Sequence, residues 1–175
     1  MELDTPYKIL GCVDISAFMK YADPTHPTWP VLEVDSRSSK YKTHEHTRSI
    51  VFSWTEHNTF FTEVTPTRRT LWYQNENAIK DICGLASNEM PLNFMIAELK
   101  PKSEIHRHQD THPIFAWARR VHVPLYIPDG VTFTIDDQPV PMCPGVMIEI
   151  ANTRYHHVVN NSDEPRYHII MDFAP

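Results

Sequence analysis

The chain is short of glycine, cysteine and long apolar runs. Its 175 residues include only four glycines, against 15 prolines. Its three cysteines, Cys12, Cys83 and Cys143, are far apart and form no C-x-x-C pair, which argues for reduced thiols, buried as small apolar side chains. The sequence begins Met-Glu-Leu-Asp without a basic segment or a long apolar stretch, so we expect neither a signal peptide nor a membrane span. These absences together favour a cytoplasmic protein.

Basic residues are the minority among the charges. The chain has 16 lysines and arginines against 22 aspartates and glutamates, a formal net charge of -6. Because affinity for nucleic-acid phosphates comes from lysine and arginine, we expect no nucleic-acid partner. The hydrophobic fraction of 41% is ordinary for a globular protein. A chain of 175 residues is most simply one domain, long enough to bury a core without disulfides or structural metals.

Two stretches have the apolar spacing of an amphipathic helix. Residues 14–23 place on one face Ile15, Phe18, Met19 and Ala22. Residues 75–86 begin with an asparagine, carry a glycine near the end, and place on one face Ile79, Ile82, Cys83 and Ala86. We therefore expect two helices in the first half of the chain.

The second half of the chain has the pattern of short strands. Many prolines and few glycines fit short strands broken by turns better than a helical bundle. Strands are expected at 94–99, 120–127, 131–135, 146–150, 155–159 and 167–173, with turns at 128–130 and 136–137. Two earlier strands, at 49–53 and 59–64, would extend one sheet. Strands at this regular spacing predict a mainly β protein, a sandwich or jelly roll.

Histidine is enriched in the same half. Seven of the 11 histidines lie between positions 106 and 168. His108 and Asp110 are two residues apart, so in an extended segment their side chains point to the same face and can converge on one ion. Two imidazoles and one carboxylate on one face of a metal suit Fe(II) and leave positions open for a chelating co-substrate and dioxygen. The pair therefore predicts a metal site that a second histidine completes.

The third ligand is His156 or His157. Adjacent residues on a strand face opposite ways, so only one of the two can point toward the metal. Arg166 follows across a turn at 160–163, so His156 and Arg166 can lie on neighbouring antiparallel strands and reach one cavity. We therefore prefer His156 and expect His157 to point outward or toward the substrate.

Three further residues are candidates for binding carboxylates. Beside a metal triad, the Arg166 guanidinium is suited to clamp a dicarboxylate in bidentate fashion. The alternative is a surface arginine paired with Asp163 or Glu164. Arg120 and His122 share one strand face by the two-residue rule. They either line the same pocket and help to neutralise a second carboxylate, or form the exposed polar face of a half-buried strand.

The remaining histidines of this region are not assigned as ligands. His106 has the strand parity of His108 and either supports a ligand from behind or is exposed. His112 has no assigned role. His44 and His46 form an H-x-H without a frame of carboxylate and arginine, and we expect them to be strand or substrate-cleft residues.

Taken together, residues 97–173 resemble the aspartyl/asparaginyl β-hydroxylase family of 2-oxoglutarate-dependent iron oxygenases. The resemblance is carried by IHRHQD, RRVHVPL and PGVMIEIANTRYHHVVNNSDEPRYHIIMDF. In the first half, LGCVDIS and THEHTRSIVFSW look like bacterial and phage members, and free-proline cis-hydroxylases are similar in the same core. Two departures are Asp110, since the animal enzymes that name the family lack this carboxylate, and Ala97, where they have a serine.

The resemblance implies a double-stranded β-helix, a jelly roll of cupin type with flanking N-terminal helices. Residues 1–175 would form a single oxygenase domain, with helices and supporting strands in 1–93 and the metal-binding core in 94–175. The residues that match iron ligands are His108, Asp110 and His156. The residues that match co-substrate contacts are Arg166, at the distal carboxylate of 2-oxoglutarate, and Arg120 and His122, near its metal-side carboxylate.

The function implied by the resemblance is that of a dioxygenase that uses Fe(II), 2-oxoglutarate and O2. It would hydroxylate an unactivated C–H bond of Asp, Asn or Pro in a peptide or protein, or of a free amino acid, and release succinate and CO2. One alternative is a cupin-type metalloenzyme of other chemistry, an isomerase or a co-substrate-free dioxygenase, which needs no dicarboxylate clamp at Arg166. Another is a non-catalytic jelly-roll binding protein. The hydroxylated substrate and the oligomeric state are left open.

Overall fold

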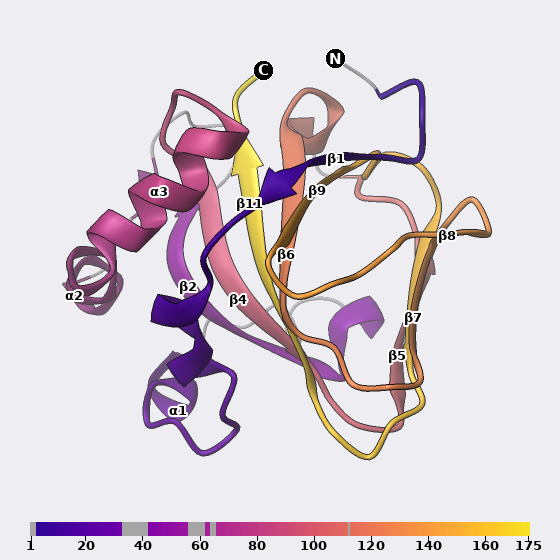
Figure 1. The fold of residues 1–175 in the computed structure, drawn as a ribbon, viewed down its shortest axis with the longest axis horizontal. Coiled ribbons are helices and arrows are strands. Elements are labelled where there is room, and N and C mark those ends of the chain that lie inside the picture. The colour runs from indigo at the N-terminus through magenta and orange to yellow at the C-terminus, as the bar shows by residue number, and fades with distance from the viewer. Residues whose placement is uncertain (1–2, 33–41, 56–61, 64–65, 112) are drawn as a thin grey trace.

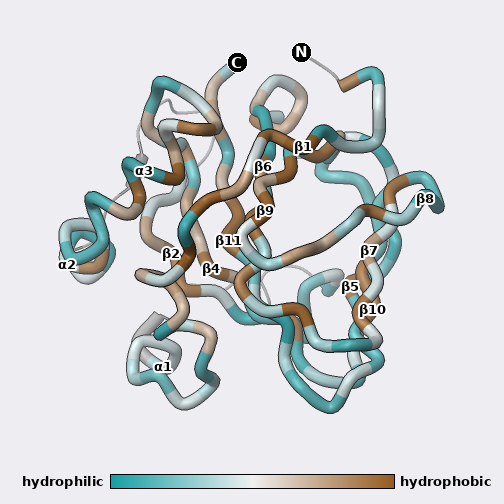
Figure 2. The backbone as a smooth tube through the Cα atoms, in the orientation of Figure 1, coloured by the Kyte–Doolittle hydropathy of each residue, from teal (hydrophilic) through white to brown (hydrophobic). Residues whose placement is uncertain are grey.

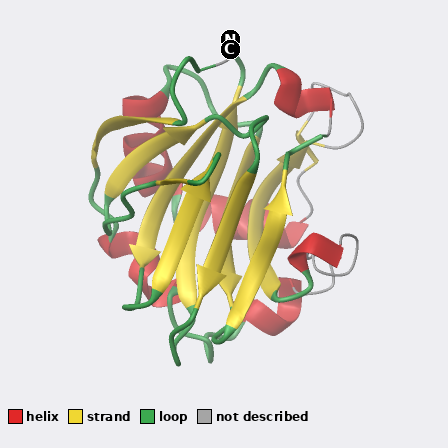
Figure 3. Cartoon of the chain, turned by 90° about the vertical axis from the view of Figure 1, so that its right-hand side faces the viewer, coloured by secondary structure: helices red, strands yellow, loops and turns green. Residues whose placement is uncertain are grey.

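Two antiparallel β-sheets with helices on one side form the fold (Figure 1; Figure 3). The computed structural model describes residues 3–32, 42–55, 62–63, 66–111 and 113–175. A seven-stranded sheet stands between the helices on one side and a four-stranded sheet on the other. This arrangement confirms the expected mainly β jelly roll with flanking helices.

The larger sheet has the strand order β1-β9-β6-β11-β4-β2-β3. Its strands are β1 (Tyr7–Cys12), β9 (Val146–Ile150), β6 (Arg119–Tyr126), β11 (Arg166–Phe173), β4 (Asn93–Leu99), β2 (Thr47–Thr55) and β3 (Thr62–Glu63). The smaller sheet has the order β5-β10-β7-β8. Its strands are β5 (Ser103–His108), β10 (His156–Asn160), β7 (Val131–Ile135) and β8 (Gln138–Pro139). Strand β11 lies at the centre of the larger sheet and is buried along its whole length.

Alternation along the central strand separates an apolar face from a polar one. The residues of β11 that pack with the helices are Tyr167, Ile169, Met171 and Phe173. Successive side chains of a strand point to opposite faces, so the residues between them point toward the smaller sheet. These inward residues include Arg166, His168 and Asp172, all of them buried. The central strand thus supplies both the main core and a polar interior between the sheets.

The helices cover the outer face of the larger sheet. They are α1 (Thr28–Leu32), α2 (Pro66–Gln74) and α3 (Glu76–Ala86). The chain also has 3-10 turns at Ser16–Tyr21, Lys42–His44 and Pro113–Ala116, and the second of these lies beside the smaller sheet. The four residues predicted for the apolar face of α3 are all buried: Ile79, Ile82, Cys83 and Ala86. Figure 2 shows this helix with apolar residues interspersed among polar ones, as the amphipathic pattern requires.

The helix expected at 14–23 is only partly confirmed. The structure has a 3-10 helix over Ser16–Tyr21, in which Phe18 and Tyr21 are buried while Met19 is 40% exposed. A 3-10 helix has three residues per turn, so residues three apart, such as Phe18 and Tyr21, share a face. Met19, predicted to lie on the apolar face four residues after Ile15, is therefore turned toward the solvent. The Asp14 carboxylate accepts bonds from the Ser16 N–H and hydroxyl, which fixes the chain just before the turn.

Each expected strand from 94 onward is present, with ends shifted by one residue at most. The expected strand at 49–53 is the middle of β2. The strand at 59–64 lies largely outside the described residues, apart from β3. Strands β1 and β8 and helices α1 and α2 were not predicted, and β5 was expected only as an extended segment around His108. No helix in the described part of the chain is long and apolar enough to cross a membrane.

The expected burial of the three thiols is wrong for two of them. Cys83 is buried, whereas Cys12 and Cys143 are exposed, and all three are free. Cys12 ends β1, which is an edge strand, and Cys143 lies in the loop between β8 and β9. Burial raises the pKa of the Cys83 thiol to about 12, so this cysteine stays protonated near neutral pH.

Candidate metal centre

Strand pairing brings His108, Asp110 and His156 together. His108 ends β5 and His156 begins β10, and the two are direct partners in the antiparallel ladder. Asp110 follows two residues after His108, and its N–H donates to the carbonyl of Asn152 at 3.1 Å. One ligand atom from each of the three lies within 4.8 Å of the other two. The sheet therefore assembles two imidazoles and one carboxylate from distant parts of the sequence.

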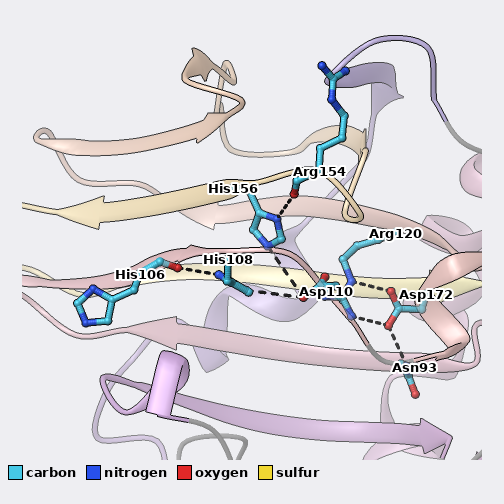
Figure 4. A network of polar contacts seen from close by, with 8 residues as sticks. All are labelled: Asn93, His106, His108, Asp110, Arg120, Arg154, His156 and Asp172. Carbon is cyan, nitrogen blue, oxygen red and sulfur yellow. Dashed lines mark hydrogen bonds and ion pairs between the residues drawn. The ribbon is translucent and has the colours of Figure 1, made fainter.

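Backbone carbonyls orient both imidazoles. The Nδ1 atom of His108 lies 2.7 Å from the carbonyl of His106, and the Nδ1 atom of His156 lies 3.0 Å from the carbonyl of Arg154 (Figure 4). A carbonyl only accepts, so each Nδ1 carries the proton and each Nε2 presents a lone pair. These Nε2 atoms lie 3.6 Å and 4.0 Å from Oδ1 of Asp110. The three atoms left for a cation are two neutral nitrogens and one carboxylate oxygen.

The Asp110 carboxylate is held in its ionised form. Burial opposes this ionisation, but the Arg120 guanidinium and the adjacent His108 and His156 lower the pKa of Asp110 well below its usual value. Burial also lowers the pKa of His156, which favours the neutral imidazole that binds metals. A donor set of two neutral imidazoles and one carboxylate fits Fe(II). The residues present thus fit the predicted metal, and their role as ligands stays a prediction.

Arg166 lies in the interior between the sheets, 3% exposed. The alternative of a surface arginine paired with Asp163 or Glu164 is therefore wrong. The Arg166 Nη2 atom donates to Nδ1 of His168 at 2.9 Å, and its Nε atom has no hydrogen-bond partner among the residues that the structure describes. Burial without a carboxylate partner lowers the pKa of Arg166 to about 9, which still leaves the guanidinium charged at neutral pH. No ion pair of Arg166 is present within the described residues.

The expectation that His156 and Arg166 lie on neighbouring strands is wrong. His156 is on β10, which pairs with β5 and β7, whereas Arg166 is on β11, which pairs with β4 and β6. The intervening turn crosses from the smaller sheet to the larger one. Asn160 stabilises this crossing, because its side-chain amide donates to the carbonyls of Lys100 and Glu164. Both residues still border the interior, but from opposite sheets.

Two further histidines extend the polar interior. In the part of the chain that the structure describes, neither ring nitrogen of His122 has a hydrogen-bond partner, and neither does Nε2 of His168. The two rings lie 5.7 Å apart, and the ring of His122 lies 5.8 Å from that of Phe133 on the opposite sheet. Burial and the positive charge of Arg166 lower the pKa of both imidazoles well below the usual value. These neutral groups, with Arg166, leave several buried donors and acceptors available to a ligand.

Arg120 shares its strand face with His122, as predicted, but its guanidinium is already engaged. It donates from Nε and Nη2 to Asp172 at 2.7 Å and 2.9 Å, and from Nη1 to Oδ2 of Asp110. Its Cζ atom also lies 4.2 Å from the ring centroid of Phe115. The alternative of an exposed polar face is wrong, since Arg120 and His122 are both buried.

Comparison with known proteins agrees with the geometry. A family model described as aspartyl/asparaginyl beta-hydroxylase matches residues 31–175. The chain belongs to the aspartyl/asparaginyl beta-hydroxylase family. The resemblance seen in the sequence motifs is thereby confirmed. A search of curated proteins finds no match.

Two solved structures are similar to this family member, and the one with a TM-score of 0.54 shares its fold. One is an oxidoreductase of the 2OG-Fe(II) oxygenase family from Burkholderia pseudomallei, with a TM-score of 0.54 and 14% identity over 73% of this chain and 67% of that one. Another is a cupin domain of an XRE family transcriptional regulator from Enterobacter cloacae, with a TM-score of 0.38 and 14% identity over 47% of this chain and 81% of that one.

In this beta-hydroxylase family member, the other histidines point away from the candidate ligands or lie beside them. His157 faces outward and lies 2.6 Å from a carboxylate oxygen of Glu104, and His106 is exposed beside the same carboxylate. The ring of His44 stands edge-on to that of His108 at 5.5 Å, within a 3-10 turn rather than a strand. His46 lies near Glu45 with an exposed side chain. His112 lies outside the described residues.

The sequence reasoning missed His168 and Asp172. Both have the strand parity of Arg166 on β11, so an inward-facing Arg166 implies that these two residues face inward as well. The same alternation found Arg120 and His122 on β6.

Proposed function

We propose that this protein is an Fe(II)- and 2-oxoglutarate-dependent hydroxylase. The observation that carries the proposal is Arg166, a buried guanidinium with no acidic partner among the described residues, in the same interior as the His108–Asp110–His156 cluster. A buried charge is costly unless it is paired, so the site favours an anionic ligand. A dicarboxylate can chelate a metal at one end and bind a guanidinium at the other. Membership of a hydroxylase family supports the same conclusion.

His108, Asp110 and His156 would hold Fe(II), which supplies the chemistry of O2 when bound. Arg166 would bind the distal carboxylate of 2-oxoglutarate, in an orientation fixed by its bond to His168. His122 would face the co-substrate as a neutral hydrogen-bonding group. Because His122, His156 and Arg166 are buried, they would exclude water from the reacting centre and strengthen electrostatic contacts there.

The proposed reaction hydroxylates an unactivated C–H bond of an amino acid and releases succinate and CO2. The target is Asp, Asn or Pro in a peptide or protein, or a free amino acid. The test is succinate release from 2-oxoglutarate under Fe(II) and O2, for the wild type and for His108→Ala and Arg166→Ala. Both variants should lose activity, while Arg119→Ala should keep it, because Arg119 pairs with Glu149 on the opposite face of β6.

Absence of 2-oxoglutarate binding by the wild-type protein would overturn the proposal. Metal binding without any 2-oxoglutarate turnover would point instead to a cupin-type metalloenzyme of other chemistry. Absence of metal binding would favour a jelly-roll binding protein. Mass spectrometry of candidate amino acids and peptides, read for the gain of one oxygen atom, would identify the substrate.

A further inference from the structure

A series of buried polar contacts connects the end of strand β2 to the candidate metal centre. The N–H of Thr55 donates to Oδ1 of Asn93 at 2.7 Å, and Nδ2 of Asn93 donates to Oδ2 of Asp172 at 2.8 Å. Arg120 then binds Asp172 through two nitrogens and Asp110 through a third (Figure 4). The Asp110 carboxylate is therefore supported by residues from four strands, β2, β4, β11 and β6.

Asp172 is fully buried, and both of its carboxylate oxygens are bound by donors. A bidentate contact between guanidinium and carboxylate fixes direction as well as distance, so Asp172 locks the otherwise flexible side chain of Arg120. The amide of Asn93 is itself locked, because its oxygen accepts the Thr55 N–H and its nitrogen must therefore face Asp172. Both oxygens of position 172 thus accept, Oδ2 from Asn93 and Arg120 and Oδ1 from Arg120, whereas an amide would turn its NH2 donor toward one of these donors.

The consequence reaches the oxygen that faces the histidines. Asp110 lies just beyond the end of β5, and Arg120 holds its Oδ2 atom. The Oδ1 atom is then the one that lies 3.6 Å and 4.0 Å from the Nε2 atoms of His108 and His156. Without a fixed Arg120, the Asp110 carboxylate could rotate and offer both oxygens or neither.

We infer that Asp172, acting through Arg120, is a positioning residue that presents Asp110 to the metal through a single oxygen and so sets the metal affinity of the site. The inference deepens the proposed function and depends on the His–Asp–His cluster being the iron site. Asp172 lies on the strand that also carries Arg166, so one strand would orient both the metal ligand and the co-substrate clamp.

The test measures binding of Co(II) alone, by titration of its visible absorption, in the absence of 2-oxoglutarate. Asp172→Asn keeps the shape of the side chain but replaces one accepting oxygen with an NH2 group. That NH2 donor then faces a donor of Asn93 or Arg120, and the contact is lost. Mutation of a residue that orients a metal ligand typically lowers metal affinity by about 10- to 100-fold, and we expect the Co(II) affinity of Asp172→Asn to fall by a factor in that range. The matched control is Glu149→Gln, which breaks the bidentate Arg119–Glu149 pair on the other face of β6 and should change the affinity by no more than about twofold.

Wild-type Co(II) affinity in a folded Asp172→Asn variant would overturn the inference. If circular dichroism shows that this variant does not fold, Arg120→Lys decides, because a lysine keeps the charge but cannot bridge both carboxylates. This variant should also bind Co(II) more weakly, and unchanged affinity would again overturn the inference. Failure of the proposed function looks different: the wild type would not bind Co(II), or His108→Ala would bind it equally well.

Discussion

Arg120 and Arg166 are two buried arginines on the inner face of the same sheet, each 3% exposed, in opposite electrostatic surroundings. Arg120 lies between the carboxylates of Asp110 and Asp172. Within the described residues, Arg166 has a histidine alone as its hydrogen-bond partner. Burial lowers the pKa of both, but the two carboxylates outweigh it at Arg120 and raise the pKa there. The contrast separates a charge that the protein itself neutralises from one that is left for a ligand.

The largest effect is expected on the free energy of unfolding when each arginine is replaced in turn by an uncharged residue. Arg120→Met leaves two buried carboxylates without a partner and should lower the free energy of unfolding by about 3–5 kcal/mol. Arg166→Met removes an uncompensated buried charge and should leave the free energy of unfolding unchanged or raise it. Urea denaturation of the ligand-free protein, followed by circular dichroism, measures both. An equal loss in the two variants would mean that Arg166 has a structural partner and that the contrast is false.

The next effect concerns co-substrate binding. Loss of a charge-assisted contact costs about 1.5–3 kcal/mol, so Arg166→Met should raise KM for 2-oxoglutarate roughly 10- to 150-fold. The affinity for Co(II) should stay as in the wild type, because Arg166 touches none of the candidate ligands. Steady-state kinetics with varied 2-oxoglutarate give KM, and Arg119→Met is the matched control. An unchanged KM would remove Arg166 from the binding site.

Stabilisation of the protein by bound 2-oxoglutarate tests the role of Arg166 without a measurement of catalysis. In the Co(II)-loaded wild type, 2-oxoglutarate at 100 times its Kd should raise the free energy of unfolding by about 2.7 kcal/mol. The same concentration should have much less effect on Arg166→Met. Pyruvate lacks the distal carboxylate, so it should stabilise the wild type and Arg166→Met equally. A larger effect of pyruvate on the wild type would contradict the assignment of the distal carboxylate to Arg166.

The smallest effect is expected at a histidine that is paired on the surface. His157 lies beside Glu104 outside the interior, so His157→Ala should change Co(II) affinity and succinate release by no more than about twofold. The neighbouring His156→Ala should lose both. Titration of Co(II) and the succinate assay compare the two variants. If His157→Ala loses metal binding while His156→Ala keeps it, the choice of the third ligand is reversed.

Local alternation was enough to predict most of the strands and the inward face of β6. It was not enough for the connection after His156. A turn between two short strands reads as a hairpin, yet here it carries the chain from one sheet to the other. Whether two strands pair or cross is decided by the partners that each finds elsewhere in the chain, which local sequence does not encode.

The reasons why elements were missed differ from one element to the next. Strand β1 contains Gly11 at positive φ and a register shift between Ile9 and Gly11, so its alternation is broken. Helix α2 begins at Pro66, a residue suited to the first position of a helix, and this signal was available in the sequence. Cys12 and Cys143 are exposed because of where an edge strand and a loop lie, which composition alone does not predict.

Most of the strands, the two-residue spacing of His108 and Asp110, and the side chains that share a strand face follow from the sequence alone, because they depend on the covalent geometry of an extended chain. Only the tertiary structure decided which buried charges are neutralised. Asp110, Arg120 and Asp172 come from a loop and two strands, and they meet because β6 pairs with β11 in one register. No partner of that kind reaches Arg166 among the described residues. The same residue type therefore has two different roles, set by long-range pairing.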